Sequence, residues 1–388
     1  MRPLVITAIT AISAMGRGGA ATLTSLESRR SGLRPSTTGA FGVVGAVDAA
    51  DDHRLPDWLA RFDCRNNRLA DLALHSDGFA DAVAAARDCY GADRIAVVVG
   101  TSTSGILATE QAYAARAATG ALPVDYDYAH THDMFSLARF VRAALELRGP
   151  ALAISTACAS SANSFVDARQ LIDSGMCDAA VVGGADSLCR MTLHGFASLE
   201  LIAPGPCRPC DAERDGISVG EAAGFALLQR SGEGIALLGY GASSDGYHMS
   251  SPHPEGIGAI AAMRAALDRA GLRPCDIDYV NLHGTGTVAN DAMEDTAIAA
   301  VFGTATPCSS TKGWSGHALG AAGILEVLIA TLSIRHDFMP GCLNVTTLDP
   351  TFRAHTLLRN TPGRVRRVLS NSFGFGGINC SLIFGTVE

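Results

Sequence analysis

Short apolar runs that end in glycine or another small residue recur along the whole chain, and alanine-rich helical stretches separate them. The runs RIAVVVGTSTSG, ALAISTACAS and DAAVVGGADS lie in the first 230 residues, and IALLGYGASS, DYVNLHGTGT and RRVLSNSFGFGGINCSLIFG lie in the rest. Apolar runs without polar alternation are typical of strands buried on both faces, and their alternation with helices predicts an α/β fold. Because the two sets of runs resemble each other, the sequence predicts two duplicated halves, residues 1–234 and 235–388.

Charge and cysteine content restrict the classes of partner and compartment. The 388 residues carry a net charge of −8 and contain no run of lysine or arginine, which argues against nucleic acid as a partner. Eleven cysteines are scattered without the spacing of a disulfide framework. In a chain this long they are typical of reduced thiols, so we expect a cytoplasmic protein.

The N-terminal stretch MRPLVITAITAISAM has two interpretations. Its positive start, apolar run and small residues resemble a secretory signal, whereas the alternation from Leu4 to Ile12 is typical of a buried strand. We favour the strand. No stretch reaches the roughly 20 apolar residues of a membrane span, so we expect no membrane association.

The stretch STACASSANSF places Cys158 after an apolar run and before a predicted helix. At a helix N-terminus, the helix dipole and the unpaired backbone N–H groups lower the pKa of a thiol, which favours a nucleophilic thiolate. Free cysteine is also among the most frequently buried residue types, so Cys158 could equally fill a gap in the core. The segment alone leaves both interpretations open.

Three further stretches place polar groups where predicted strands end and loops begin. NLHGTGT carries His283, STKGWSGHALGAAGILE carries Lys312, His317 and Glu326, and SNSFGFGGINCSLIF forms a glycine-rich turn before a strand. Each has a structural explanation of its own, since a histidine at a strand end is often only a hydrogen-bonding partner and glycine turns are common. Loops at strand ends converge on one pocket in open α/β sheets, so together the stretches favour a catalytic site around Cys158.

These motifs resemble those of the elongating β-ketoacyl-acyl-carrier-protein synthases. The resemblance covers nearly the whole chain and rests on TACASS, RPCDAERDG, SSDGYHMSSP, HGTGT, TKGWSGHALGAAG and NSFGFGG. It implies a thiolase-like α/β fold, a five-layer αβαβα sandwich of two duplicated halves, in an obligate dimer. The N-terminal half would carry the nucleophile and the insertions for dimer and substrate contacts, and the C-terminal half would carry two catalytic histidines. The implied reaction is the decarboxylative Claisen condensation of an acyl thioester with malonyl-acyl-carrier protein, in fatty acid, polyketide or aryl-polyene chain elongation.

The resemblance also implies a role for each catalytic residue. Cys158 would attack the acyl thioester and hold the acyl chain, and the backbone N–H groups of Cys158 and Phe375 would form the oxyanion hole. His283 and His317 would donate hydrogen bonds from Nε2 to the enolate that decarboxylation leaves, so that loss of either would slow decarboxylation more than acylation. Lys312 would pair with Glu326 and tune the two histidines, with a purely structural ion pair as the alternative.

Other positions in the motifs would bind or orient the substrate. Thr285 and Thr287 would hydrogen-bond the phosphopantetheine arm, and Phe375 would gate the acyl pocket. The residues expected to orient the active-site loops are Asp245, Asp291 and Glu294. No cofactor is expected beyond the phosphopantetheine that arrives on the carrier protein, and no catalytic metal. In relatives, backbone atoms near the positions that correspond here to Asn281, Ser370 and Asn371, together with the Glu326 carboxylate, hold a structural monovalent cation, so the resemblance implies such a site here.

The same resemblance implies protein partners. An enzyme of net charge −8 needs a local basic patch to attract an acidic acyl carrier protein. Arg65 and Arg68 resemble the docking residues of the family, with solvated surface arginines as the alternative. The dimer would be a homodimer, or a heterodimer with a chain-length-factor-like ketosynthase subunit.

Departures from the family pattern bear on the substrate. Where relatives carry apolar residues of the acyl pocket, this chain has DYAHTHDMF, with Tyr128, His130, His132 and Asp133. Thr103 stands where some relatives carry a bulkier aliphatic gate. Polar groups are costly to bury against a plain alkyl chain, so we expect an acyl chain that is longer, conjugated or polar-ended. The pattern resembles ketosynthases of aryl-polyene pathways.

Three alternatives compete with this interpretation. An initiating synthase primed by acyl-coenzyme A would have asparagine in place of His317. A degradative thiolase would need a second catalytic cysteine, and Cys380 lies past the glycine-rich turn, inside a predicted strand. A non-enzymatic chain-length or scaffold subunit would have no use for Cys158, His283 and His317. The sequence therefore favours the elongating enzyme.

Overall fold

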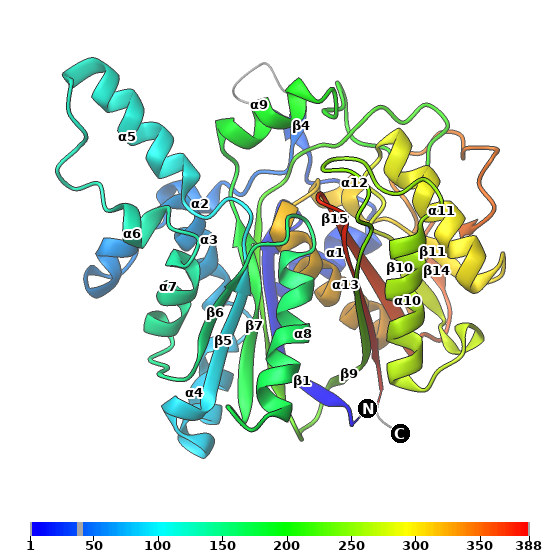
Figure 1. Ribbon diagram of the computed structural model, residues 1–388, viewed down its shortest axis with the longest axis horizontal. Helices are drawn as coiled ribbons and strands as arrows, with labels where there is room; N and C mark the ends of the chain where they lie inside the picture. Colours follow the sequence, from blue (N-terminus) through cyan, green and yellow to red (C-terminus); the bar gives the residue numbers. More distant parts are fainter. Residues whose placement is uncertain (1, 37–41, 387–388) are drawn as a thin grey trace.

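A continuous path of hydrogen-bonded strands forms the centre of the molecule (Figure 1). The computed structural model describes residues 2–36 and 42–386. The N-terminal half contributes β1 (Leu4–Ser13), β2 (Gly16–Arg17), β5 (Ile95–Gly100), β6 (Ala151–Ile154), β7 (Ala179–Asp186) and β8 (Ala222–Gln229). The C-terminal half contributes β9 (Ile235–Ser244), β10 (Tyr279–Asn281), β11 (Pro307–Ser309), β13 (His355–Thr356), β15 (Arg367–Gly374) and β16 (Ile378–Gly385).

The two halves share one strand order. Among the five main strands of each half, the sequence order across the sheet is third, second, fourth, fifth, first: β6-β5-β7-β8-β1 and β11-β10-β15-β16-β9. The first three strands in each order are parallel, and the others are antiparallel to their neighbours. β1 also pairs with β9 through Leu4–Ile6, which joins the two sets into one sheet. The common topology is the duplication that the resemblance between the two sets of runs predicts.

Two helices, α8 (Ser160–Asp173) and α13 (Ala322–His336), lie between the two sets of strands and pack against each other (Figure 1). Their side chains share one hydrophobic cluster with strands of both halves, in which Phe165 and Ile324 are fully buried. The close approach depends on Gly323, because a Cβ there would lie 2.8 Å from the backbone nitrogen of Ala162. These helices form the middle layer of the fold.

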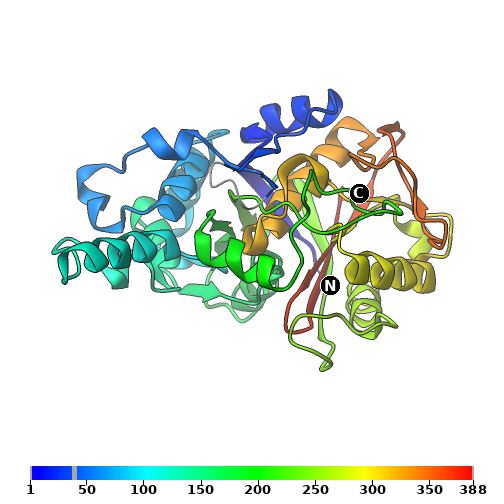
Figure 2. The same cartoon turned by 90° about the horizontal axis from the view of Figure 1, so that it is seen from above.

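Helices also cover the outer face of each set of strands (Figure 2). The helices on the N-terminal set are α3 (Arg65–Leu74), α4 (Phe79–Tyr90) and α7 (Ser136–Ala144). Those on the C-terminal set are α10 (Ile257–Ala270) and α11 (Val288–Phe302). The result is the thiolase-like five-layer αβαβα sandwich, which confirms the predicted fold.

The other helices and strands connect these layers. The remaining helices are α1 (Gly18–Glu27), α2 (Ala49–Asp52), α5 (Ile106–Thr119), α6 (Tyr128–Thr131), α9 (Arg190–Ser198) and α12 (Lys312–Ser315). The short strands are β3 (Arg34–Pro35), β4 (Val43–Val44), β12 (Phe338–Met339) and β14 (Thr361–Pro362), and the 3₁₀ helices are Asp57–Phe62, Ala92–Arg94, Pro274–Asp276 and Leu319–Ala321. α5 and α6 form an arm that projects from the N-terminal half (Figure 1).

Two apolar segments are buried inside this sandwich. β1 lies between β8 and β9, and most of its side chains are buried, which confirms the strand interpretation of the N-terminal stretch. The segment Leu319–His336 is 18 residues long with a mean hydropathy of 1.4, enough by length and composition to cross a membrane, and 89% of it is buried inside the protein. It includes α13, the middle-layer helix. All eleven cysteines are free thiols.

Candidate active site

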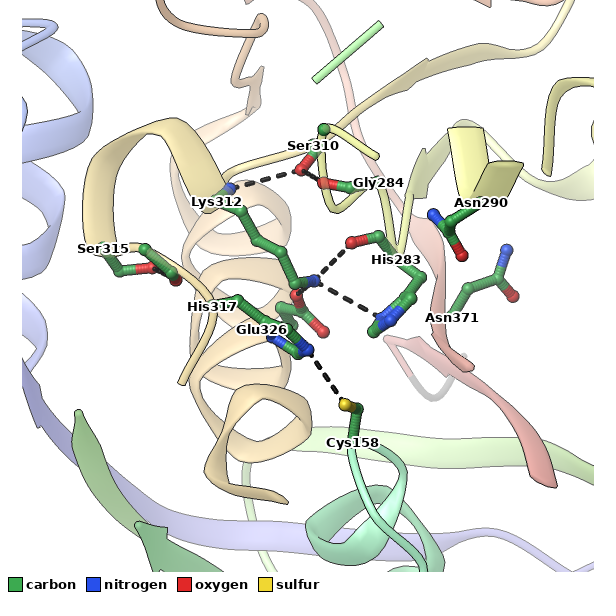
Figure 3. A network of polar contacts seen from close by, with 12 residues as sticks. Cys158, His283, Gly284, Asn290, Ser310, Lys312, Ser315, His317, Glu326 and Asn371 are labelled. Atoms are coloured by element: carbon green, nitrogen blue, oxygen red, sulfur yellow. Dashed lines mark hydrogen bonds and ion pairs between the residues drawn. The ribbon is translucent and has the colours of Figure 1, made fainter. Parts of the chain in front are cut away.

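Loops from both halves bring the reactive side chains together. Cys158 lies just before α8, and His317 lies between α12 and α13. Because α8 and α13 pack against each other, the residues that precede them meet, and His317 Nε2 lies 2.9 Å from Cys158 Sγ (Figure 3). The ring of His283, which follows β10, lies 5.2 Å from the His317 ring, centroid to centroid, at 82°. Residues 158, 283 and 317, far apart in sequence, thus form one buried cluster.

A strained turn presents the Cys158 sulfur. Ala157 adopts a left-handed backbone conformation with φ +50°, which is uncommon for a residue other than glycine and occurs mostly where surrounding contacts enforce it. Its carbonyl oxygen accepts hydrogen bonds from the hydroxyls of Ser102 at 2.9 Å and Ser160 at 2.5 Å. The backbone N–H of Phe375 donates to the Cys158 sulfur. The sulfur therefore contacts both an imidazole and a backbone donor of the predicted oxyanion hole.

Burial decides the protonation states in this cluster. It raises the pKa of the Cys158 thiol to about 12, although Lys312 and the Phe375 N–H act in the opposite direction. The predicted lowering of this pKa is therefore wrong, because loss of hydration outweighs the helix N-terminus. Burial, and then the Lys312 charge, hold the pKa values of His283 and His317 well below the ordinary range. The resting cluster is a neutral thiol with two neutral imidazoles.

Lys312 fixes the proton of His283. It is the only lysine in the sequence, and it is buried. Its Nζ lies 2.5 Å from Glu326 Oε1 and 3.5 Å from His283 Nδ1, and it also donates to the His283 carbonyl oxygen (Figure 3). An ammonium can only donate hydrogen bonds, so Nδ1 of His283 is the acceptor and the ring proton is on Nε2. The ion pair thus leaves His283 with an Nε2–H donor.

A buried carboxylate holds the loop that carries His283. Glu294 accepts hydrogen bonds from the N–H groups of His283 at 2.8 Å and Gly284 at 2.7 Å, and from the side-chain amide of Asn371 at 3.1 Å. Burial raises its pKa to about 7, while these three donors favour the ionised form. Glu294 therefore orients the loop without touching the reacting atoms.

Two other predicted carboxylates hold neighbouring loops in the same way. Asp291 accepts a hydrogen bond from the N–H of Gly286 at 3.2 Å, and burial raises its pKa. Asp245 accepts from the side-chain amide of Asn379 at 2.7 Å and from the N–H of His253 at 3.0 Å. The Asn379 contact connects the loop after β9 to β16, the strand that follows the glycine-rich turn.

A pocket contains the cysteine and both histidines. Thr285 and Thr287 line it further out, with their hydroxyl oxygens 2.9 Å apart, and exposed Ser251 lies on its wall. Phe375 also lines the pocket, and its ring packs against Phe196 of α9 with centroids 5.7 Å apart. The pocket therefore joins the predicted arm-binding threonines and the predicted gate to the nucleophile.

Four residues predicted to contact the substrate lie outside the lining of this pocket. Thr103 is fully buried, and its hydroxyl donates to Asp186 at 2.9 Å. Tyr128 is 55% exposed on α6, and its ring packs edge-on against His132 at 5.1 Å. Asp133 accepts a backbone N–H two residues further on at 2.7 Å. Contact between these side chains and an acyl chain stays a prediction.

The two predicted docking arginines are engaged within the fold. Arg65 makes two contacts with the fully buried carboxylate of Glu221, at 2.6 and 2.8 Å, and also pairs with Asp51. Only 14% of its side chain is exposed, which contradicts an exposed docking position for Arg65. Arg68 pairs with Asp63 at 2.5 Å and is more exposed, so its docking role stays a prediction.

Three residues near the candidate active site lie outside the motifs recognised in the sequence. Phe196 packs against the predicted gate, Glu221 binds Arg65, and Asp186 binds a loop close to the nucleophile. Asp186 has one signal in the sequence, since it is the charged residue that ends the apolar run DAAVVGGAD. The contacts of Phe196 and Glu221 depend on tertiary packing alone.

Two sets of side chains could hold a cation. Glu326 Oε2 and Asn281 Oδ1 are buried without a hydrogen-bond partner among the described residues. Orphaned buried oxygens suit a monovalent cation, so the Glu326 carboxylate fits the predicted structural site, whose other predicted ligands are backbone atoms near Asn281, Ser370 and Asn371. The ligand atoms of Cys158, His283 and His317 also lie within 4.8 Å of one another, a set that zinc accepts. The Lys312 ammonium beside His283 opposes a divalent cation there.

Comparisons with known proteins agree with this geometry. The model of the beta-ketoacyl synthase N-terminal domain matches residues 61–233, and that of the beta-ketoacyl synthase C-terminal domain matches residues 235–346. Nodulation protein E of Rhizobium meliloti is 34% identical over 379 residues, which cover 92% of this chain and 93% of that protein. The mitochondrial 3-oxoacyl-[acyl-carrier-protein] synthase of Arabidopsis thaliana is 40% identical over 263 residues. That match covers 62% of this chain and only 57% of the length of the plant protein.

A solved structure matches the whole chain. It is the ketosynthase ApeO from Xenorhabdus doucetiae in complex with its chain length factor ApeC, with 40% identity and a TM-score of 0.94. The match covers 100% of this chain and 98% of that one. Sequence and fold agree across both halves, and the chain belongs to the beta-ketoacyl synthase family.

Proposed function

We propose that this protein is a β-ketoacyl-acyl-carrier-protein synthase, which condenses an acyl group held on Cys158 with malonyl-acyl-carrier protein. The observation that carries the proposal is the 2.9 Å contact between Cys158 Sγ and His317 Nε2, beside a His283 ring whose proton Lys312 fixes. A nucleophile, a proton acceptor and a separate hydrogen-bond donor in one buried pocket meet the needs of acyl transfer and decarboxylation. We place the reaction in the cytoplasm.

In the first half-reaction, the Cys158 sulfur attacks the thioester carbonyl carbon while its proton passes to Nε2 of neutral His317. The bond from that carbon to the carrier sulfur then breaks, and His317 returns the proton to the departing sulfur. Between these events the carbonyl oxygen carries negative charge and accepts hydrogen bonds from the N–H groups of Phe375 and Cys158. One such donor contributes about 3 kcal/mol in other acyl-transfer enzymes.

In the second half-reaction, the malonyl thioester loses carbon dioxide, and the electron pair of the broken bond forms an enolate. The enolate oxygen accepts the hydrogen bond of His283 Nε2–H. The enolate carbon attacks the acyl carbonyl carbon and the bond from that carbon to the Cys158 sulfur breaks. The sulfur leaves as a thiolate, and a proton taken up from solvent and passed on by His317 Nε2 restores the thiol. Nδ1 of His317 has no hydrogen-bond partner among the described residues, so the ring is free to accept at Nε2 in one step and to donate there in the other.

Thr285 and Thr287 support delivery of both substrates by the same route. Their hydroxyls lie on the wall of the pocket that ends at Cys158. The hydroxyls of Thr285 and Thr287 lie 2.9 Å apart, and Thr285 Oγ1 also accepts the Thr287 N–H at 3.3 Å. With the Thr285 hydroxyl as the donor in their mutual hydrogen bond, each oxygen keeps a lone pair for an amide N–H of a phosphopantetheine arm. We assign Phe375, which lines the same pocket as Cys158, as the gate between this arm and the sulfur.

An exposed strand edge supports assembly with a second ketosynthase-type chain. β6 is the last strand at one end of the sheet path, and it pairs only with β5 among the described strands. Leu152 on this edge is 37% exposed, and the strand ends four residues before Cys158. An unpaired edge is a template for pairing with another chain. We therefore place the dimer contact here, with a chain-length-factor-like subunit as the partner, as in the complex of the relative.

The arm of α5 and α6 supports a long or polar-ended acyl substrate. It carries the polar residues Tyr128 and His132, and Thr109 links the His132 ring to Tyr126 through its hydroxyl. Since α6 lies just before the outer helix α7, which contacts β6, these groups lie on the side where we place the partner. Faster extension of ordinary saturated chains than of aryl or polyene chains would exclude this part of the proposal.

Two other functions are separated from this one by their chemistry. A chain-length or scaffold subunit needs no acyl-enzyme, and a synthase primed by acyl-coenzyme A would load from coenzyme A without a carrier protein. The three candidate functions give different results in one loading experiment.

Carrier docking at Arg68 and cation binding near Asn281 and Glu326 are further predictions, which binding measurements can test.

The experiment incubates the protein, alone and co-purified with its partner, with acyl-carrier protein or with acyl-coenzyme A. Intact-mass analysis then follows the covalent adduct, and added malonyl-carrier protein should release the β-ketoacyl product. We expect acylation from the carrier protein and none in a folded C158A variant, because the small neighbours of Cys158 tolerate alanine. A folded wild-type protein with its partner that acquires no adduct would contradict the proposal and favour the scaffold function.

A further inference from the structure

The fully buried carboxylate of Asp186 has no part in the mechanism so far, yet it lies between the loops of the nucleophile and of His317. It is the last residue of β7. Its Oδ1 accepts hydrogen bonds from the backbone N–H groups of Ser102 and Thr103, each at 2.8 Å, and from the Thr103 hydroxyl. Its Oδ2 accepts the N–H of Gly320 at 2.6 Å, three residues after His317 in the other half of the chain.

These donors favour the ionised carboxylate. A backbone N–H can only donate, so three of the groups around Asp186 need an acceptor. Burial raises the pKa of this carboxyl, and the hydrogen bonds act in the opposite direction. A buried acceptor with this many donors holds its surroundings in one geometry, because any displacement would leave a buried polar group unpaired. The contact with Gly320 also leaves no room for a side chain at that position, since a Cβ at Gly320 would lie 2.7 Å from Asp186 Oδ2.

Ser102 links Asp186 by hydrogen bonds to the peptide bond between Ala157 and Cys158. The Ser102 N–H binds Asp186, and the Ser102 hydroxyl donates to the carbonyl oxygen of Ala157 at 2.9 Å. This carbonyl belongs to the same planar peptide unit as the N–H of Cys158, so fixing one end of the unit fixes the direction of the other. The Cys158 N–H is one of the two donors assigned to the oxyanion hole.

We propose that Asp186 is a positioning residue that, through Ser102, orients the Cys158 N–H toward the acyl oxyanion and, through Gly320, holds His317 at the Cys158 sulfur. The inference rests on the proposed acyl transfer. It assigns Asp186 to the loading step, in which a misdirected donor costs rate without removing the nucleophile. A carboxylate that only stabilised the fold would have no such selective effect.

The test compares two reactions of the same sulfur in the D186N variant. Loading from acyl-carrier protein needs the oxyanion hole, whereas alkylation by iodoacetamide needs an accessible thiolate but no oxyanion hole. We expect D186N to lower the loading rate at least about tenfold relative to the alkylation rate, since removal of a whole oxyanion-hole donor costs about 10²–10³-fold. The S102A variant keeps the carboxylate and its backbone donors, and should lower the same ratio about threefold. The matched control is D178N, at the opposite end of β7, where an exposed carboxylate pairs with Arg94 at 2.7 Å.

The outcomes separate this inference from the proposed function. Wild-type protein that is never loaded contradicts the acyl-transfer function itself. If the wild-type protein is loaded but the ratio of loading rate to alkylation rate is unchanged in folded D186N and S102A, only the role of Asp186 is overturned. An equal fall of the loading and alkylation rates in the variants would overturn it as well. If circular dichroism shows that D186N does not fold, S102A alone decides the test. It removes only the hydrogen bond from the Ser102 hydroxyl to the Ala157 carbonyl oxygen and leaves the buried carboxylate in place.

Discussion

The two halves of the molecule have the same strand order but different chemistry at equivalent loops. After the third strand, the N-terminal half carries the nucleophile Cys158, and the C-terminal half carries Lys312 and His317. After the second strand, the N-terminal half carries the hydroxyl loop of Ser102, and the C-terminal half carries His283. One half therefore supplies covalent attachment, and the other supplies protons and positive charge.

Each half also holds its second-strand loop with one buried carboxylate. Asp186 accepts the N–H groups of Ser102 and Thr103, and Glu294 accepts those of His283 and Gly284. The two carboxylates lie on different elements, β7 and α11. The comparison shows that the duplicated fold needs its strand-end loops fixed in both halves, whatever reactive group each loop carries. It also predicts that changes in the two halves should affect different steps.

The largest expected effect separates the steps through the histidines. H283A removes the donor to the enolate, so condensation should fall about 10²–10³-fold while acyl loading stays within about threefold of wild type. H317A should lower both rates, instead of mainly decarboxylation as the resemblance implies, because its Nε2 contacts the Cys158 sulfur. Stopped assays of loading and of carbon dioxide release measure the two steps. Equal loss of loading in H283A and H317A would break the proposed division between the halves.

The next effect concerns the ion pair of the C-terminal half. K312M should lower condensation about 10²-fold and should destabilise the fold by about 3–5 kcal/mol, because it leaves the Glu326 carboxylate buried and unpaired. The double variant K312M/E326L removes both charges and should recover stability but not activity. Thermal denaturation and condensation assays measure the two properties. Recovery of activity in the double variant would make the pair purely structural.

A smaller effect is expected from pH on the N-terminal half. Burial raises the pKa of Cys158 to about 12, so the thiolate is a minor form at neutral pH and its fraction grows about tenfold per pH unit. The alkylation rate of Cys158 should therefore keep rising above pH 9, where a free cysteine in solution levels off. Iodoacetamide labelling followed by peptide mapping measures this rate. A plateau near pH 7 would show that the helix N-terminus outweighs burial after all.

The smallest effect is expected where the substrate arm binds. T285V and T287V each remove one hydroxyl from the pocket wall and should raise KM for carrier-bound substrates about threefold to tenfold, since a hydrogen bond contributes about 0.5–1.5 kcal/mol. kcat should stay nearly unchanged, because neither hydroxyl touches the reacting atoms. Steady-state kinetics with carrier-bound substrates checks this. A fall in kcat at constant KM would place the threonines closer to the chemistry.

The sequence was informative where a local pattern determines the structure. The apolar runs predicted the strands, the helical stretch after Cys158 is α8, and the glycine-rich turn lies beside the sulfur. The residue roles came from motifs of a known family, and the coordinates bring Cys158, His283 and His317 into one cluster. Local sequence thus predicted which side chains matter and on which elements they lie.

The sequence was not informative where partners come from distant segments. Arg65 looked like a surface charge, but Glu221 binds it across 156 residues of sequence. Asp186 binds Gly320 across 134 residues, which no spacing rule reveals. The pKa of Cys158 was predicted in the wrong direction, because a helix N-terminus can be read from sequence and the depth of burial cannot. Tertiary packing decided each of these cases.

The single buried lysine has a practical consequence. Acyl thioesters modify primary amines without a catalyst, and the one lysine side chain of this protein is 2% exposed inside the catalytic centre. All other basic side chains apart from histidine are arginines, whose guanidinium groups stay charged and resist acylation. In the presence of the proposed acyl thioester substrates, the protein thus offers no lysine on its exterior for accidental acylation. A lysine-specific protease would have one place to cut, and cleavage there would signal that the catalytic centre itself has come apart.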